Sequence, residues 1–233
     1  MEKRRDSATA SIILADGFET IEALTPLDVL RRCGVKVTTI SLNKTRSVRS
    51  SHGVTVEADA TMEEYMLKRS NAGSSSSAGI SSGSTNITNA GSSTGASDTN
   101  TTASTSTNVS GTMRQALILP GGYPGYKNLC ESAEVGALIT QFHKEGKLLC
   151  AICGATTALK ANQICRGAAI TCHTSVKEEL SDYYSILSSA VVKYMNIITG
   201  MGAGRSLDFA FAIAEALTSK EKVEEIKAKM EII

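Results

Sequence analysis

The chain has 233 residues, with 24 Lys and Arg against 23 Asp and Glu, a formal net charge of +1, and only 4% aromatic residues. Proteins that stack nucleic-acid bases favour aromatic side chains on a basic surface, so this composition argues against a nucleic-acid partner. No apolar run approaches the ~18 residues of a membrane span, so we expect no membrane partner either. Six irregularly spaced cysteines are too sparse for a disulfide scaffold, and we interpret them as thiols of a reducing compartment.

A short apolar run near the beginning of the sequence could be a signal peptide or a strand. Residues 12–15 follow a basic start, as in a signal peptide, but Asp16 ends the run at roughly half the necessary length. We therefore interpret it as a buried strand and expect a cytoplasmic protein.

The composition changes sharply between residues 70 and 112, which are almost entirely Ser, Thr, Gly, Asn and Ala. Such a segment cannot bury enough apolar surface to offset the entropy lost on ordering. We predict a disordered insertion within a single domain that spans residues 1–233. A phosphorylated tether is one alternative. Glycosylation, disfavoured without a signal peptide, is another, at the sequons of Asn86, Asn100 and Asn108.

Outside this insertion, strand-like and helix-like stretches alternate. The strands are predicted at residues 11–15, 35–41, 52–57, 115–119, 148–152, 168–172, 191–193 and 196–199. The helices are predicted at residues 19–33, 61–68, 133–144, 154–161, 206–217 and 220–229. This alternation predicts an α/β fold with a mostly parallel sheet and helices on both faces. Ligands of such sheets bind beyond the carboxyl ends of the strands.

The most informative of these strand ends carries Cys153, where a strand runs directly into a helix. Ala151 and Ala155, two residues to either side, fit a nucleophile elbow with Cys in place of Ser. A thiol at a helix N-terminus favours its thiolate, so we predict a thiol pKa below the ordinary value. A buried structural cysteine and a redox pair with Cys150 are the alternatives, although Cys150 falls inside the strand.

Two further strand ends carry backbone and carboxylate groups. Gly121 and Gly122 follow the strand at 115–119, and paired glycines let N–H groups point at an oxyanion, although they also fit a plain turn. Asp16 and Glu19 fit a capping box at the start of the first long helix. Glu22 lies one turn further on among apolar neighbours, so it either needs a partner such as a thiol or faces solvent.

Several stretches in the same order resemble the ThiJ/PfpI superfamily, in its Parkinsonism-associated protein deglycase and glyoxalase III-like branch. They are LADGFETIEA at 14–23, PLDVLRRCG at 26–34, LPGG at 119–122, AICG at 151–154, GAG at 202–204 and DFAFAIAEAL at 208–217. Together they cover nearly all of the chain outside the insertion and the first few residues.

The resemblance implies a flavodoxin-like three-layer sandwich with a mostly parallel central sheet, a homodimer, and a site with no cofactor and no metal. It aligns Cys153 with the reactive cysteine of the family and Glu22 with the carboxylate that contacts its sulfur. The residues that it aligns with the oxyanion-side backbone and the nearby histidine are Gly121, Gly122, Gly154 and His173.

The chain also departs from this family in places. The protease-like branch has His directly after the cysteine, whereas this chain has Gly154, which argues against a peptidase. Thr174 stands where the family usually has Pro after the histidine. Ala203 replaces the Pro of the family's Gly-Pro-Gly turn, and His52 replaces an arginine near the pocket. These departures concern substrate preference and pocket polarity.

Two function classes use the same residues. The first is a cofactor-independent glyoxalase or deglycase, in which Cys153 attacks methylglyoxal, glyoxal or an early glycation adduct on a protein and Glu22 moves the proton. The second is a redox sensor or oxidation-regulated chaperone in which the Cys153 thiol is oxidised. A thiamine-pathway kinase lacks support, because the sequence has no Gly-rich Lys loop to hold phosphate.

Overall fold

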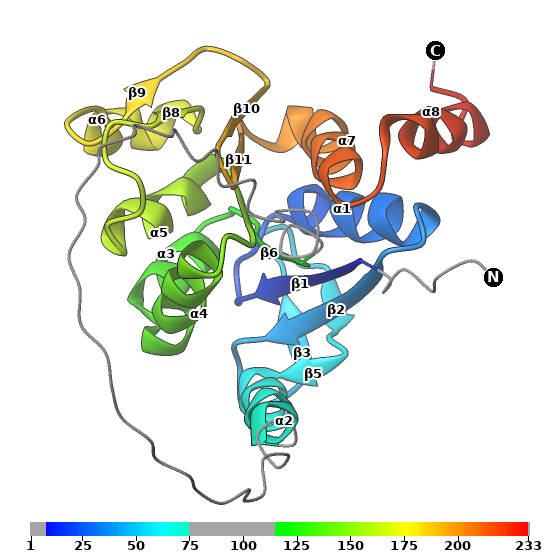
Figure 1. The fold of residues 1–233 in the computed structure, drawn as a ribbon. Helices are drawn as coiled ribbons and strands as arrows, with labels where there is room; N and C mark the ends of the chain where they lie inside the picture. Colours follow the sequence, from blue (N-terminus) through cyan, green and yellow to red (C-terminus); the bar gives the residue numbers. More distant parts are fainter. Residues whose placement is uncertain (1–7, 75–114, 233) are drawn as a thin grey trace, which may run out of the picture.

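The computed structural model describes residues 8–74 and 115–232. Its centre is a seven-stranded sheet in the order β10-β11-β7-β6-β1-β2-β5, in which neighbours pair in parallel except β10 and β11. Helices cover both faces of the sheet (Figure 1). This confirms the predicted α/β fold with a mostly parallel sheet.

The strands of the main sheet are β1 (Thr9–Leu14), β2 (Lys36–Ser41), β5 (Ala60–Thr61), β6 (Gln115–Leu119), β7 (Leu148–Ile152), β10 (Val191–Tyr194) and β11 (Ile197–Gly200). Two smaller pairs are the antiparallel hairpin of β3 (Ser47–Arg49) with β4 (Thr55–Glu57), and β8 (Ala169–Ile170) with β9 (Ser185–Ile186). The helices are α1 (Thr20–Arg32), α2 (Met62–Ser74), α3 (Gly125–Glu131), α4 (Ala133–Lys144), α5 (Thr156–Ala161), α6 (Lys177–Ser181), α7 (Ser206–Leu217) and α8 (Lys220–Lys229). Short 3₁₀ turns precede α5, α6 and α7 at Cys153–Ala155, Thr174–Val176 and Ala203–Arg205.

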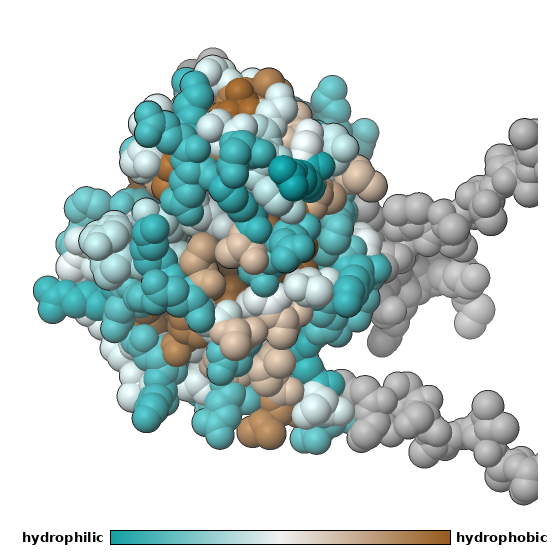
Figure 2. Space-filling model, turned by 90° about the vertical axis from the view of Figure 1, so that its left-hand side faces the viewer, coloured by the Kyte–Doolittle hydropathy of each residue, from teal (hydrophilic) through white to brown (hydrophobic). Residues whose placement is uncertain are grey.

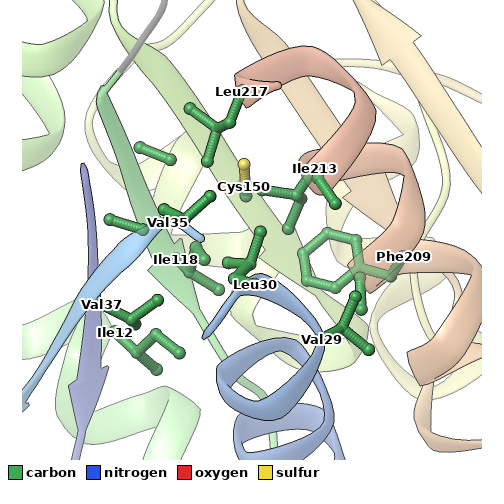
Figure 3. Packing of buried hydrophobic residues seen from close by; sticks show 14 of the residues in the cluster. Ile12, Val29, Leu30, Val35, Val37, Ile118, Cys150, Phe209, Ile213 and Leu217 are labelled. Atoms are coloured by element: carbon green, nitrogen blue, oxygen red, sulfur yellow. The ribbon is translucent and has the colours of Figure 1, made fainter. Parts of the chain in front are cut away.

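The central strands are apolar on both faces, as expected for parallel strands covered by helices on both sides. In β6, Ile118 points into the core under α1 and α7, while Leu117 and Leu119 point into the core under α4 and α5. Figure 3 shows the first core, where Leu30 of α1 and Phe209 of α7 pack close to Ile118. Because successive side chains point to opposite faces of a strand, burial of both sets fixes the register of β6 and the face on which each of its side chains lies.

Strongly periodic elements form where the sequence predicts them. Strands β6 and β7 and helices α4, α7 and α8 have the predicted bounds. Helix α1 lies within its predicted range, and Gly34 follows it with φ +79°, a left-handed conformation that ends helices readily.

Elements with weak or irregular patterns differ from the prediction. The strand predicted at 52–57 is the second half of the β3–β4 hairpin, with His52 in its turn, and the strand predicted at 168–172 is only two residues long. Helix α3 was not predicted, because its seven residues follow Pro124 and bury only Gly125 and Leu129.

The start of the predicted insertion also differs. Helix α2 continues to Ser74, although a helix ending at residue 68 and an insertion beginning at residue 70 were predicted. Arg69 anchors the end of this helix by donating to Gln141 on α4 over 3.0 Å and lying above the Tyr65 ring. Residues 75–112 of the predicted insertion lie outside the described residues.

The outer surface carries mainly polar side chains. On the face shown in Figure 2, hydrophobic residues form small patches between hydrophilic ones. Within residues 8–74 and 115–232, no helix has both the length and the apolar character needed to cross a membrane.

Candidate active site

The predicted sharp bend is present at Cys153, at the carboxyl end of β7. Cys153 has φ +63°, the left-handed region that residues other than glycine rarely adopt, and it begins the 3₁₀ turn before α5. The Gly154 position faces the Tyr126 ring so closely that a Cβ there would lie 2.8 Å from Tyr126 Cδ1. A strained backbone at a strand end is typical of functional sites, because the surrounding fold must hold it in place.

Glu22 is completely buried on α1, so the alternative of a solvent-facing glutamate is wrong. The Gly121 N–H donates to Glu22 Oε2 over 2.8 Å. A Cβ on Gly121 would lie 2.6 Å from this oxygen and 3.1 Å from Cys153 Sγ, so only glycine lets the carboxylate and the thiol approach each other here. Glu22 Oε1 is buried without a hydrogen-bond partner among the described residues, which leaves one oxygen free to exchange a proton.

The predicted glycines divide into two roles. The Gly121 N–H is taken by the carboxylate, whereas the N–H groups of Gly154 and Gly122 hydrogen-bond the Cys153 sulfur. Gly122 has φ +92°, which aims its N–H at the thiol. The N–H groups at the thiol are therefore those of Gly122 and Gly154, whereas the Gly121 N–H holds Glu22 in place.

Burial is the main influence on both ionisable groups. It raises the pKa of Glu22 from 4.5 to about 7, against the opposing effects of the Cys153 side chain and the Gly121 N–H, while the Glu19 charge adds to the rise. A carboxyl group with a pKa near neutrality can both accept and return a proton, which is what general acid–base chemistry requires.

The expectation of a low thiol pKa is wrong. Burial first, and then the Glu22 carboxylate, raise the pKa of Cys153 to about 12, against the N–H groups of Gly154 and Gly122. The helix-dipole argument fails because Cys153 enters a short 3₁₀ turn and a six-residue helix, whose dipole is weak beside the cost of burying a thiolate. The thiol therefore needs a base to accept its proton as it reacts.

His173 lies next to the elbow, but its ring is turned to other partners. Its backbone N–H donates to the Cys153 carbonyl over 3.4 Å. The ring Nδ1 accepts from the Ser175 N–H over 3.2 Å and lies 2.8 Å from Ser175 Oγ. The structure thus brings His173 next to Cys153 through its backbone, while its exposed ring is held by Ser175 through Nδ1.

A polar cluster beside the site was not predicted as such. Asp16 does not cap α1, because its Oδ1 accepts from the Arg49 N–H over 2.9 Å. Glu19 is the N-cap residue, and its Oε2 lies 3.2 Å from both Ser51 Oγ and His52 Nδ1. The Glu19 N–H donates to the Gly121 carbonyl, so this cluster joins the hairpin to the turn that carries Gly121. The turn of the β3–β4 hairpin places Ser51 and His52 beside Glu19.

The described residues hold no group of three or more His, Cys, Asp or Glu side chains placed to bind a metal ion. All six cysteines are free thiols, and Cys150 is fully buried, so the elbow thiol has no disulfide partner in the structure.

Comparisons with known proteins agree with this architecture. The model of the DJ-1/PfpI family matches residues 8–216. The chain is 31% identical over 221 residues to protein dj-1beta of Drosophila melanogaster, covering 94% of this chain and 95% of that protein. The crystal structure of Drosophila DJ-1beta superimposes with a TM-score of 0.75 over 97% of this chain and 99% of that one. This chain is also 37% identical to the glutathione-independent glyoxalase DJR-1.2 of Caenorhabditis elegans over 107 residues, which cover 46% of this chain and 56% of that relative.

Proposed function

Because the chain belongs to the DJ-1/PfpI family, we propose that it is a cofactor-independent glyoxalase or protein deglycase. Its substrates are small dicarbonyl compounds, methylglyoxal and glyoxal, or the early adducts that they form on proteins. The glyoxalase relative from Caenorhabditis elegans supports this reading. The observation that carries it is Glu22, a fully buried carboxylate held against the Cys153 thiol, one of whose oxygens has no hydrogen-bond partner within residues 8–74 and 115–232.

The proposed reaction begins with addition of the thiol to the aldehyde. Cys153 Sγ forms a bond to the aldehyde carbon of methylglyoxal, the S–H proton passes to Glu22, and the Gly122 and Gly154 amides stabilise the resulting oxyanion. Glu22 returns this proton to the oxygen, which gives a hemithioacetal and leaves the carboxylate ionised again.

Glu22 then removes the proton from the former aldehyde carbon, giving an enediol, and a proton returns to the neighbouring carbon. The product is a thioester of lactate: the first carbon is oxidised, the second is reduced, and no outside oxidant is needed. Water hydrolyses the thioester to lactate and restores the thiol; glyoxal gives glycolate by the same route. We propose that His173 Nε2 assists these proton transfers from the edge of the site.

A redox-sensing or chaperone function is the second candidate. The same burial that raises the pKa of Glu22 keeps it protonated in mildly acidic conditions, where it can donate a hydrogen bond to an oxidised Cys153. The number of events per protein molecule separates the two functions. An enzyme releases many lactate molecules per chain from excess methylglyoxal, whereas a sensor consumes at most one equivalent and then stops.

The rate of dicarbonyl turnover is expected to rise with pH, with a midpoint near 7. Glu22 must be ionised to accept the thiol proton, and burial places its pKa at about 7. Initial rates measured between pH 5.5 and pH 8.5 (roughly 1.5 pH units either side of that pKa) should trace the ionised fraction. A rate that does not change across this range would remove Glu22 ionisation from the mechanism.

We also propose that the protein works as a homodimer, as its family resemblance implies, and that it is cytoplasmic, as the interpretation of its cysteines as thiols of a reducing compartment suggests. Light scattering during gel filtration tests the assembly, because a dimer has twice the 24.5 kDa mass of one chain. Elution at the mass of one chain would contradict it.

The predicted insertion, with its start moved to residue 75 because α2 continues to Ser74, is proposed to be a segment that the catalytic fold does not need. The described chain resumes at Gln115, at the amino end of β6, whereas the site lies beyond the carboxyl ends of β6 and β7. Replacing residues 75–112 by a short Gly-Ser linker keeps α2 whole and should leave circular dichroism and dicarbonyl turnover within about twofold, since loop length costs little. Loss of folding would show that the insertion is structural.

A further inference from the structure

A second cysteine outside the elbow also lies beside a proton acceptor. Cys165 follows α5, and its Sγ lies 3.6 Å from Nε2 of His143, in the last turn of α4. Cys165 has φ +47°, so it shares the left-handed backbone of Cys153. Its sulfur is partly exposed, and the site residues described above are not among its partners.

The loop holds Cys165 rigidly in this orientation. Ile164 before it receives a hydrogen bond on its carbonyl from the Tyr184 hydroxyl over 2.6 Å. After it, the Gly167 N–H donates to the Tyr183 carbonyl over 2.8 Å, and the Ala168 N–H donates to the Cys165 carbonyl over 3.0 Å. Because both flanks are tied down, the backbone of Cys165 is held at the position from which its sulfur contacts the imidazole.

His143 is arranged to exchange protons through one nitrogen. Its Nδ1 is buried and has no hydrogen-bond partner among the described residues, whereas Nε2 faces the sulfur. A buried polar atom without a partner is uncommon and calls for an explanation.

We propose that Cys165 and His143 form a second nucleophile–base pair, which captures small soft electrophiles of the α,β-unsaturated carbonyl class. Sγ forms a bond to the β-carbon of the electrophile, and the thiol proton passes to Nε2. The π electrons of the carbon–carbon double bond move toward the carbonyl to give an enolate, which takes that proton back. The product is a thioether, and no oxidant takes part.

Cys130 provides a matched control within the chain. It is also a partly exposed free thiol, but its sulfur lies 3.3 Å from the Thr157 hydroxyl, which is no base at neutral pH. Burial raises the pKa of both thiols, so the loss of the Cys165 rate advantage on replacing His143, rather than the difference between the two cysteines alone, reports the imidazole.

The test uses N-ethylmaleimide on the full chain carrying Cys153→Ser, with peptide mass spectrometry to follow each cysteine. Cys165 should react ~10-fold or more faster than Cys130, and His143→Gln should remove this advantage without changing the Cys130 rate. Cys150, which is fully buried, reports unfolding if it becomes labelled. Equal rates at Cys165 and Cys130 in the chain that keeps His143 would overturn the proposal, as would an unchanged Cys165 rate in folded His143→Gln.

Discussion

Glu22→Gln is expected to lower the rate of methylglyoxal turnover by ~10²-fold or more, the usual scale for loss of a general acid–base group. The amide has the size of the carboxyl group and its oxygen can still accept from the Gly121 N–H, but it cannot take the Cys153 proton. Because burial and the neighbouring charge raise the pKa of that thiol to about 12, little thiolate forms without a base.

Measuring turnover and Cys153 sulfinic acid in the same variant separates the two proposed functions. If the protein is an enzyme, Glu22→Gln should lose most of its turnover. If it is a sensor, the amide can still donate a hydrogen bond to the oxidised sulfur, so oxidation of Cys153 should change only modestly. Glu63→Gln, at an exposed position on α2, serves as the control for loss of a carboxylate elsewhere. Unchanged turnover in Glu22→Gln would leave Cys153 in need of another base, with His173 the next to test.

The same substitution should stabilise the fold above neutral pH. The pKa of Glu22 is about 7 when folded against 4.5 for the free group, so the folded state binds the extra proton and stability falls as pH rises between these values. Above pH 7 the ionised, buried group costs about 3 kcal/mol of unfolding free energy, from 1.36 kcal/mol per pKa unit. Urea unfolding should show Glu22→Gln gaining stability over the parent chain at pH 8 but not at pH 4.

Gly122→Ala is expected to lower the free energy of unfolding by about 3 kcal/mol or more, the sum of a left-handed backbone and a severe overlap. Gly122 has φ +92°, and a Cβ there would overlap the backbone of Gly17, Phe18 and Glu19. These are backbone atoms at the start of α1, so no side chain can rotate away. The turn would have to open, and the Gly122 N–H would leave the Cys153 sulfur.

Gly146→Ala separates the cost of the left-handed backbone from the cost of the steric overlap. Gly146 also has a positive φ, +65°, but a Cβ there would meet nothing within 4 Å, so only the backbone cost of about 1 kcal/mol remains. Denaturant unfolding of both variants measures the difference. Equal losses would mean that the close approach at Gly122 does not constrain the site.

The sequence predicts the elements whose pattern is repeated along their whole length. Buried strands such as β6 and β7 are bounded by turn residues, and the 3.6-residue period of α4 and α7 is unambiguous. Helix α3 and the bounds of strand β3 were not predicted, although β4 lies within the strand predicted at 52–57, because short elements are set by the neighbours that they pack against.

The residues of the site could be predicted from the sequence, whereas the ionisation of the thiol and the His143–Cys165 contact could not. Cys153, Glu22 and the glycines were identified from strand ends and from a resemblance, and the structure brings them together. The direction of the thiol pKa was not predictable, because it depends on how much water reaches the sulfur. The His143–Cys165 contact joins residues 22 positions apart on different elements, and no local pattern marks it.

Lactate released from methylglyoxal by the unaltered chain and by Cys153→Ala, counted per protein molecule, tests the proposed function most directly. Cys130→Ala controls for loss of a partly exposed thiol elsewhere. The account predicts many lactate molecules per chain for the unaltered protein and for Cys130→Ala, and only the uncatalysed background for Cys153→Ala. Undiminished lactate formation by Cys153→Ala, or none by the unaltered chain, would contradict it.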